Sequence, residues 1–356
     1  MLRLGICFWG GMSILETIES VGFAEQYGFE VALVIEGFAD PYALLAAAAM
    51  RTSSIKLGTG VTTAFTRTPT VTAINAATLD VISKGRVLLG IGAGHRENHM
   101  LRDDVEVTRP LPFVNTLGRM HESVEIIRLI LQQAAINQPV HYHGTTFKVD
   151  GFRLRFEPHR IKIPIYFGAL AERTLSLAGA IADGVMPNLV PLDMVPSMIA
   201  SVHAGATAAG RNPREVDIAG FVPTCVSSDG AAARRAMRYH VSSYVVRLEF
   251  YRRHLQRLGE EAAVREILES AARGDLDSAA ACVTDEVLDG STIAGDPNHC
   301  RIQLERFRTA GIALPILFPI HPEFTGLHPA PGVAASIQTA IQELGPTRNM
   351  QLGDQS

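Results

Sequence analysis

The stretch KGRVLLGIGAGHREN, residues 84–98, contains the most distinctive strand end in the chain. Residues 87–91 form an apolar run typical of a buried strand, and glycines alternate with other residues from position 90 to 94, just before His95. Glycine-rich turns after strands often bind phosphate. A dinucleotide fingerprint, however, has G-x-G-x-x-G directly after the first strand, whereas here the spacing is G-x-G-x-G and a polar segment follows. Either the small residues let the strand end tightly, or they let a flat ligand lie against it.

On both sides of this stretch, apolar strands alternate with helices. Strands are predicted at residues 3–9, 30–35, 55–61, 86–92, 163–169, 183–188, 215–227 and 313–319. Helices are predicted at residues 13–28, 41–50, 69–83, 117–131, 172–182, 194–210, 296–312 and 332–344. Continuous apolar strands separated by helices indicate a parallel sheet that is covered on both faces. Eight strand–helix units predict an α/β fold, a (β/α)8 TIM barrel, as one domain over residues 1–356.

Two insertions interrupt the alternation. Residues 96–116, after the fourth strand, are polar, and residues 230–286, after the seventh, have a helical pattern. A β-hairpin is also predicted at residues 140–156. Because loops on a rigid scaffold commonly carry binding residues, we expect the two insertions to contribute to a substrate site. Local signals support the helices: Ser13 and Glu16, for example, form a capping-box pattern at the start of the first one.

Composition limits the classes of function. Of 356 residues, 47% are hydrophobic and 19% charged, and the formal net charge is -4. A nucleic-acid surface would need a basic stripe, and no apolar run reaches the ~18 residues of a membrane helix. The four cysteines have no metal-binding spacing, so no metal site is expected. The first residues, MLRLGICFWGG, lead straight into a strand and are too short for a signal peptide, so we expect a cytoplasmic protein.

The chain resembles the bacterial luciferase-like superfamily in four ordered segments. They are AEQYGFE (24–30), IKLGTGVTTAFTRTPTVTAINAATLDVISKGRVLLGIGAGH (55–95), PIYFGALAERTLSLAGAIADGVMPN (164–188) and IAGDPNHCRIQLERFRTAGIALPILFP (293–319). Within the superfamily, the chain is most similar to the branch that uses the deazaflavin coenzyme F420, typified by methylene-tetrahydromethanopterin reductases. The resemblance implies a TIM barrel with the cofactor ring in its mouth.

The resemblance also implies a set of cofactor-binding residues. In the F420 branch, a cis peptide bond forms a bulge in the third strand behind the ring, and the matching bond here is Gly60–Val61. The loop after the fifth strand opens a helix whose free N–H groups suit a phosphate; Arg173 adds charge there or lies on a solvated helix face. The implied residues are Gly60, Val61, Thr62, Gly92, Ala93, Gly94, Gly168, Ala169, Leu170, Ala171, Arg173 and Asn188.

Two residues are candidates for acid–base catalysis. Glu36 ends an apolar strand, a costly place for a carboxylate unless it faces the mouth; it is either catalytic or a structural, loop-capping group. His95 is either catalytic or caps its turn. The F420-dependent glucose-6-phosphate dehydrogenases of the superfamily place a histidine where Gly37 stands and a catalytic glutamate where His95 stands. Sugar-phosphate oxidation is therefore not expected.

Other side chains allow two interpretations. Trp9, the only tryptophan, packs on a ligand or belongs to the core. His240 and His254 are expected at the surface or in loop contacts. Residues 234–257 form a basic, aromatic helix with one buried and one solvated face, unless a phosphate tail or an acidic substrate is bound there by Arg247, Arg252 or Arg253.

Three functions remain open. The leading hypothesis is an F420-dependent oxidoreductase that transfers a hydride to or from a small organic substrate. The second is an FMN-dependent two-component monooxygenase of the same superfamily, which needs a partner flavin reductase. The third is a non-catalytic flavin-binding barrel. The resemblance also implies a homodimer, and no nucleic-acid or membrane partner is expected.

Overall fold

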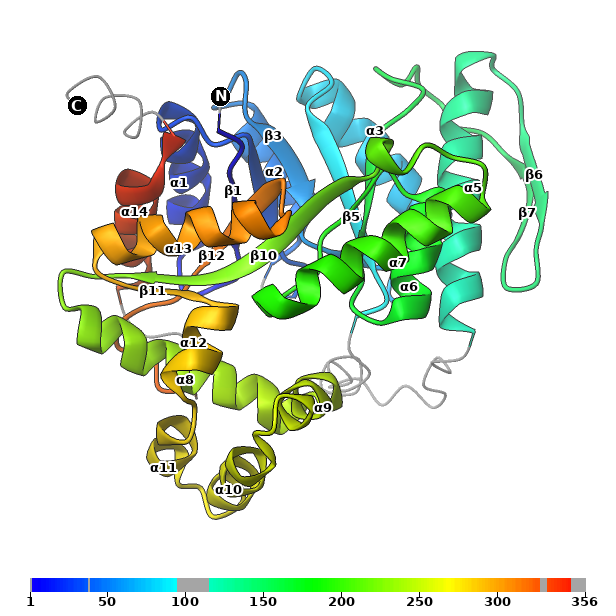
Figure 1. Ribbon diagram of the computed structural model, residues 1–356. Helices are drawn as coiled ribbons and strands as arrows, with labels where there is room; N and C mark the ends of the chain where they lie inside the picture. Colours follow the sequence, from blue (N-terminus) through cyan, green and yellow to red (C-terminus); the bar gives the residue numbers. More distant parts are fainter. Residues whose placement is uncertain (1, 38, 95–114, 327–331, 347–356) are drawn as a thin grey trace.

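The computed structural model describes residues 2–37, 39–94, 115–326 and 332–346. It is a closed (β/α)8 TIM barrel (Figure 1), which confirms the fold prediction. Within the described residues, parallel strands occupy eight positions around the barrel, and the third position is split in two. The strands are β1 (Gly5–Phe8), β2 (Val31–Val34), β3 (Lys56–Thr59) with β4 (Thr62–Thr63), β5 (Val87–Gly92), β8 (Ile165–Gly168), β9 (Gly184–Val185), β10 (Asp217–Val226) and β12 (Leu314–Pro319).

The ring is closed by β10, the longest of these strands. Its first residues pair with β9, its middle pairs with β12, and β12 pairs with β1. At the amino-terminal end of the barrel, the Arg3 guanidinium bonds both Glu30, at 2.7 Å, and Asp217, at 2.7 Å. The Tyr166 hydroxyl donates to the same Asp217 carboxylate at 2.7 Å. These polar contacts join residues that lie at or just before the first residues of β1, β2, β8 and β10.

Helices cover the outside of the barrel. The Ser13–Glu16 capping box is present, and Asp40 and Asp296 cap helices that begin with a proline, where the missing N–H costs nothing. The covering helices are α1 (Ile14–Gln26), α2 (Pro41–Ala49), α3 (Pro69–Ile82), α5 (Thr116–Ala135), α6 (Glu172–Ile181), α7 (Val195–Ala208), α13 (Pro297–Ala310) and α14 (Val333–Leu344), with short 3-10 turns η1 (Leu192–Met194) and η2 (Pro213–Glu215).

The second insertion is a helical unit that stands beyond one end of the barrel (Figure 1). It consists of α8 (Gly230–Arg247), α9 (Glu249–Arg257), α10 (Glu261–Ala272), α11 (Leu276–Ala281) and α12 (Asp285–Ser291). The short strand β11 (Ile293–Gly295), which the sequence did not predict, then pairs with the end of β10. The predicted hairpin is confirmed as β6 (Val140–His143) and β7 (Lys148–Phe152). Most of the first insertion lies outside the described residues.

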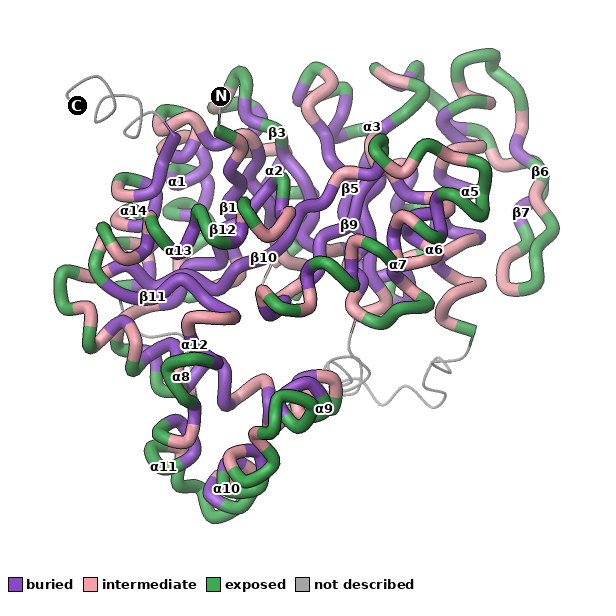
Figure 2. The backbone as a smooth tube through the Cα atoms, viewed as in Figure 1, coloured by how far each residue is buried: buried purple, intermediate pink, exposed green. Residues whose placement is uncertain are grey.

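The core has two layers because the barrel strands are buried on both faces (Figure 2). Ile6 and Phe8 pack outward against the helices, whereas Cys7 between them packs inside the barrel. Successive side chains of a strand point to opposite faces, so one strand serves both layers. Both layers are apolar, as expected for a parallel barrel.

An ion pair between a buried aspartate and a partly exposed arginine holds the start of β5. The Asp80 side chain, 1% exposed, accepts hydrogen bonds from Arg160 Nε at 3.0 Å and Nη2 at 2.5 Å. It also accepts from the Val87 N–H at 3.3 Å. The pair therefore joins the end of α3 to the first residue of the strand that carries the glycine run.

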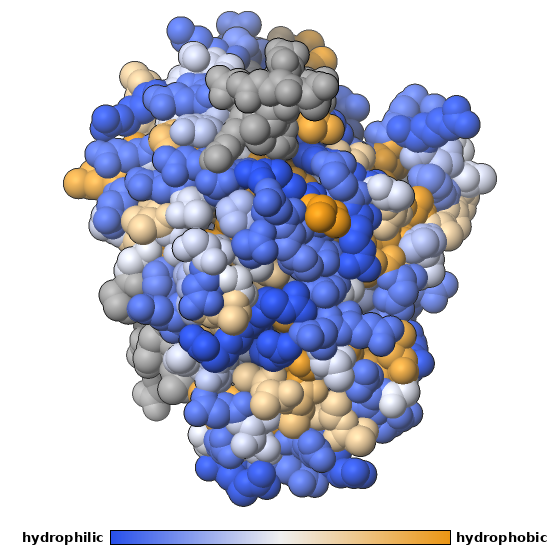
Figure 3. Space-filling model, turned by 60° about the vertical axis from the view of Figure 1, so that its left-hand side comes forward, coloured by the Kyte–Doolittle hydropathy of each residue, from blue (hydrophilic) through white to orange (hydrophobic). Residues whose placement is uncertain are grey.

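The exterior is largely hydrophilic. On the face shown in Figure 3, apolar side chains occur in small separate groups among hydrophilic ones. Exposed apolar residues such as Ile302, 65% exposed, lie on covering helices. Of the helices in the described part of the chain, none combines the length and apolar character needed to cross a membrane.

Candidate active site

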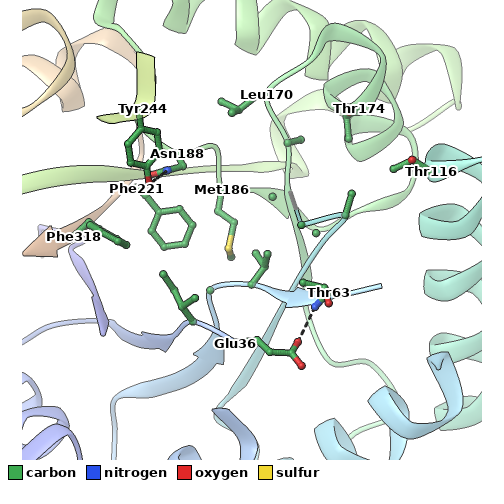
Figure 4. A pocket seen from close by; sticks show the side chains of 18 residues that line it. Glu36, Thr63, Thr116, Leu170, Thr174, Met186, Asn188, Phe221, Tyr244 and Phe318 are labelled. Carbon is green, nitrogen blue, oxygen red and sulfur yellow. Dashed lines mark hydrogen bonds between the residues drawn. The ribbon is translucent and has the colours of Figure 1, made fainter. Parts of the chain in front are cut away.

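A cavity of about 370 Å³ opens at the carboxyl ends of the barrel strands. Its wall combines strand ends with Tyr244 of the insertion helix α8 (Figure 4). TIM-barrel active sites lie at this end of the barrel, so the cavity is the candidate site. The described residues that line it are Ile35, Glu36, Gly60, Val61, Thr63, Gly92, Ala93, Gly94, Thr116, Gly168, Ala169, Leu170, Thr174, Met186, Asn188, Phe221, Tyr244 and Phe318.

The bulge between β3 and β4 contributes the central part of the wall. The Gly60–Val61 peptide bond is cis, as the resemblance implied, and the strand resumes at Thr62 in register with β5. Beside the bulge, Thr59 Oγ1 donates to the Gly90 carbonyl at 2.7 Å and accepts from the Gly90 N–H at 3.0 Å. The Thr59 side chain thus bridges β3 and β5 where the regular ladder is interrupted.

The alternating glycines of β5 leave space for this bulge. A Cβ on Gly90 would lie 2.0 Å from the Thr59 carbonyl oxygen, and one on Gly92 would lie 2.6 Å from Val61 Cγ2. The first explanation, a tightly packed strand end, therefore accounts for Gly90. Gly92 packs against Val61 and also lines the cavity, so both explanations apply to it. We call Gly60, Val61, Gly92 and Gly168 the floor of the cavity.

Glu36 lines the cavity, but its carboxylate bonds neighbouring residues. Oε2 accepts from the Thr62 hydroxyl at 2.7 Å and the Thr63 N–H at 2.9 Å, and Oε1 accepts from Arg67 Nε at 2.8 Å. The Glu36 side chain is 9% exposed and that of Arg67 18%. These bonds hold the segment that follows the bulge, which favours the structural role for Glu36 over the catalytic one. His95, the other catalytic candidate, lies outside the described residues.

Thr62 does not reach the cavity, contrary to the prediction. It is 1% exposed and its hydroxyl bonds Glu36. The next residue, Thr63, lines the wall instead, because successive residues of a strand point to opposite sides. Because the bulge interrupts the strand just before Thr62, the inward and outward positions of β4 cannot be predicted by continuing the alternation of β3.

The start of α6 requires a similar correction. Ala171 and Arg173 were predicted to bind a cofactor, but both are exposed and neither lines the cavity. Leu170 and Thr174 line it instead (Figure 4). Leu170 lies just before the N-cap residue Ala171, and Thr174 lies in the first turn of α6. Arg173 lies on the solvated side, as the alternative interpretation expected.

The opposite end of the cavity is aromatic and comes from residues that the sequence did not mark. Phe221 of β10, Phe318 of β12 and Tyr244 of α8 gather there (Figure 4). The side-chain nitrogen Nδ2 of Asn188 donates to the Tyr244 hydroxyl oxygen at 3.1 Å, and the main-chain carbonyl of Asn188 accepts from the Tyr251 hydroxyl at 2.7 Å. Burial raises the pKa of Tyr244 above its ordinary value, so the phenol stays protonated at neutral pH.

His240 is buried behind Tyr244 and not at the surface as predicted. It is 4% exposed, and its ring lies 4.9 Å from that of Tyr244 and 6.0 Å from that of Phe318. Burial, with a smaller contribution from the charge of Arg247, lowers the pKa of His240 to about 3. The imidazole is therefore neutral at neutral pH. His254 is also buried, at 5% exposed, which corrects the same prediction.

Replacing His240 by phenylalanine is expected to make the protein more resistant to acid. The folded pKa of about 3 lies below the ordinary value of 6.5. Between these values the unfolded chain binds more protons, so stability falls as the pH falls, by about 1.4 kcal/mol per unit for this group. Between pH 7 and pH 4.5, the free energy of unfolding of wild type should fall by about 2–3 kcal/mol more than that of His240→Phe. Urea unfolding across a pH series measures this difference. The two proteins should differ least in pH dependence near pH 7, where the wild-type imidazole is already neutral; an equal pH dependence in wild type and His240→Phe across the series would contradict the burial argument.

Trp9 belongs to the core beside the cavity. Its ring stacks on Phe318 with centroids 5.3 Å apart and planes at 17°. Its Nε1–H donates to the Pro319 carbonyl at 2.7 Å. It therefore supports Phe318 from behind and is absent from the described lining of the cavity.

The arginines after Tyr244 differ in their contacts. Arg252 donates to two carbonyl groups near the end of α8, and Arg253 forms an ion pair with Glu249 at 2.7 Å. Arg247 lies over the Tyr244 ring, 5.1 Å from its centroid, and is exposed. Only Arg247 of the three stacks on a residue that lines the cavity. In the described part of the chain, no group of three His, Cys, Asp or Glu residues is arranged to hold a metal ion.

The chain is similar to known proteins along most of its length. The family model of luciferase-like monooxygenases matches residues 9–314. The chain is 33% identical over 329 residues to the 5,10-methylenetetrahydromethanopterin reductase of Archaeoglobus fulgidus, covering 90% of this chain and 95% of that protein. It is 31% identical over 315 residues to the reductase of the same name from Methanolobus tindarius, covering 87% and 92%. The solved structure of a coenzyme F420-dependent tetrahydromethanopterin reductase from Methanopyrus kandleri matches with a TM-score of 0.83 at 27% identity, covering 97% of this chain and 99% of that one.

Proposed function

This chain belongs to the luciferase-like monooxygenase family, and on that premise we propose that it is an oxidoreductase that uses coenzyme F420 to transfer a hydride to or from a small organic substrate. Relatives that cover most of its length are reductases, and a solved structure of the same fold is described as F420-dependent. The observation that carries the proposal is the floor, where three glycines and Val61 form one surface at the barrel mouth.

The residues of the cavity fit a flat cofactor with a polar tail. Glycines at the floor have no Cβ, so a planar ring can approach the backbone closely. The first turn of α6 offers N–H groups that suit a phosphate, since its N-cap residue Ala171 makes no side-chain cap. The Thr174 hydroxyl lies beside them on the cavity wall. We propose that these groups, rather than the Arg173 guanidinium, hold the charged tail.

The protein's own residues would prepare the reaction by positioning. F420, when bound, supplies a carbon centre that gives or accepts a hydride. Val61 and its glycine neighbours would form the surface under a bound ring, and Glu36 holds Thr63 through the bonds described above. Phe221 and Phe318 exclude water from the opposite end. Gly37 has a φ of 149°, a conformation that disfavours the histidine of the sugar-phosphate dehydrogenases.

Fluorescence titration of the purified protein with F420 and, separately, with FMN tests the proposal. We expect tight binding of F420 and weak binding of FMN. The Gly92→Ala variant should bind F420 about tenfold more weakly, equal to about 1.4 kcal/mol, because the added methyl group must displace Val61. The double variant Gly92→Ala/Val61→Ala, which frees that space, should recover affinity.

Gly22→Ala is the matched control, because a Cβ there meets nothing within 4 Å. A preference for FMN would overturn the proposal and favour the monooxygenase alternative. Binding of neither cofactor would favour the non-catalytic barrel. Unchanged F420 affinity in Gly92→Ala would place the cofactor away from the floor.

A further inference from the structure

The two ends of the cavity differ in chemistry (Figure 4). Thr116 and Thr174 bring hydroxyl groups to one end. We use the name aromatic end for the other, which is formed by Phe221, Phe318, Tyr244 and Asn188. A polar cofactor tail suits the first end, so the aromatic end is the part left for the substrate.

The polar atoms of the aromatic end are one hydroxyl and one amide. Asn188 Nδ2 donates to the Tyr244 oxygen, so the Tyr244 proton is free to be donated elsewhere, and among described residues it meets no acceptor. Asn188 Oδ1 is buried and has no hydrogen-bond partner in the described part of the chain. The pair therefore retains one donor and one acceptor. The amide could also be placed the other way round, with its oxygen accepting from the Tyr244 hydroxyl. The Asn188 amide nitrogen would then be the free donor and the Tyr244 oxygen the free acceptor, so the pair would still offer one of each.

Both groups are held in place from behind. The Tyr251 hydroxyl donates to the main-chain carbonyl of Asn188 at 2.7 Å. The Tyr244 ring packs against His240 and, edge-on, against Tyr251 at 5.4 Å between centroids. An unpartnered buried acceptor costs about 1–3 kcal/mol, and a ligand that donates to Asn188 Oδ1 removes that cost.

Among the described residues, the lining of the aromatic end contains no charged side chain. Glu36 is the one charged side chain among the described lining residues, and Arg67 pairs with it. His240, behind Tyr244, is neutral at neutral pH for the reason given above. Arg247 is exposed on the outer side of the site and is absent from the described lining. A ligand's carboxylate or phosphate buried here would find no partner of opposite charge among the described lining residues, and an unpaired buried charge is costly.

We propose that the aromatic end binds an uncharged substrate with an apolar body, and that Tyr244 and Asn188 hold its single carbonyl or hydroxyl group. The body packs between Phe221 and Phe318. The carbonyl form accepts from the Tyr244 O–H, and the alcohol form, which differs by one hydride and one proton, also donates to Asn188 Oδ1. The pair thus satisfies both forms. This inference rests on the proposed function, but it concerns binding by the chain's own residues.

Binding of three small probes to the full-length protein tests it: acetophenone, ethylbenzene and benzoate, followed by ligand-observed NMR without cofactor. We expect acetophenone to bind more tightly than ethylbenzene, and benzoate to bind most weakly. Tyr244→Phe should weaken acetophenone about two- to tenfold, the range of one hydrogen bond, and leave ethylbenzene unchanged. That unchanged value shows that the pocket keeps its shape. Phe221→Ala should weaken acetophenone and ethylbenzene alike.

Two results would overturn the inference. Equal acetophenone affinity in wild type and Tyr244→Phe would show that the phenol does not hold the heteroatom. Tighter binding of benzoate would assign an anionic substrate, with Arg247 as its anchor. F420 titration of the same samples separates the two proposals. If F420 does not bind but the probes bind as expected, only the proposed cofactor is wrong. If F420 binds but the probes do not follow the expected order, only the proposed substrate class is wrong.

Discussion

Asp80→Ala is expected to lower the free energy of unfolding by about 2–3 kcal/mol, because a buried N–H and a partly exposed arginine lose their acceptor. Asp80 is 1% exposed and bonds Arg160 through two nitrogens. Without its carboxylate, the Arg160 charge and the Val87 N–H both lose their partner. Val87 begins β5, so the loss affects the strand that carries Gly90 and Gly92.

Urea unfolding of Asp80→Ala, Asp80→Asn and a surface control measures the effect. Asparagine keeps an acceptor for Val87 and should cost less than alanine, about 1–2 kcal/mol. Glu249→Ala breaks an exposed pair whose side chains are 63% and 66% exposed, and should cost below about 1 kcal/mol. If Asp80→Ala is no more destabilising than Glu249→Ala, the Asp80–Arg160 pair does not hold β5.

Glu36→Ala is expected to lower both stability and F420 affinity. Removal of the carboxylate leaves the charge of Arg67, 18% exposed, and the Thr62 and Thr63 donors without that acceptor. Because Arg67 keeps its pair with Asp40 and the main loss is the acceptor of two buried donors, we expect a loss of about 2–3 kcal/mol in the free energy of unfolding. Because Thr63 is part of the cavity wall, F420 should bind about tenfold more weakly.

Glu36→Gln separates a structural from a catalytic role. Glutamine keeps an acceptor for Thr62 and Thr63 but not the charge that pairs with Arg67, so stability should fall by less than in Glu36→Ala. Asp40→Ala, which removes the more exposed partner of the same arginine, is the control and should have the smaller effect on F420 binding. Wild-type stability and wild-type F420 affinity in Glu36→Ala would restore Glu36 as a candidate acid or base.

The barrel was predictable because its signals are local. The Ser13–Glu16 capping box and the prolines that begin α2 and α13 are short-range patterns, and runs such as 31–34 are apolar throughout. The split of the third strand is different. Its position came from the resemblance, because no local pattern in the residues around Gly60 distinguishes a bulge from a strand-end glycine.

The cavity was predictable only in part. The resemblance was enough to place the floor and Asn188 in the lining of one cavity, but Asn188 lies beside Tyr244, at the end opposite Thr174, and not at the start of α6 where it was expected. The inward residues of β10 and β12 were not predictable, since Phe221 points into the barrel and Val222 points outward, yet both are apolar. Tyr244 and His240 were missed because the buried side of α8 depends on what the helix packs against, which only the folded chain supplies.

The split of the cavity between segments of the chain has an evolutionary meaning. The floor and the start of α6 lie before residue 190, whereas Phe221, Tyr244 and Phe318 come from the later part, and Tyr244 comes from an insertion that stands apart from the ring of strands. Mutation or exchange of α8 can therefore change what the protein recognises without altering the surface assigned to the coenzyme. Such an arrangement lets related proteins keep the same coenzyme chemistry while their substrates diverge. It also makes α8 the segment to mutate first in directed evolution of substrate preference.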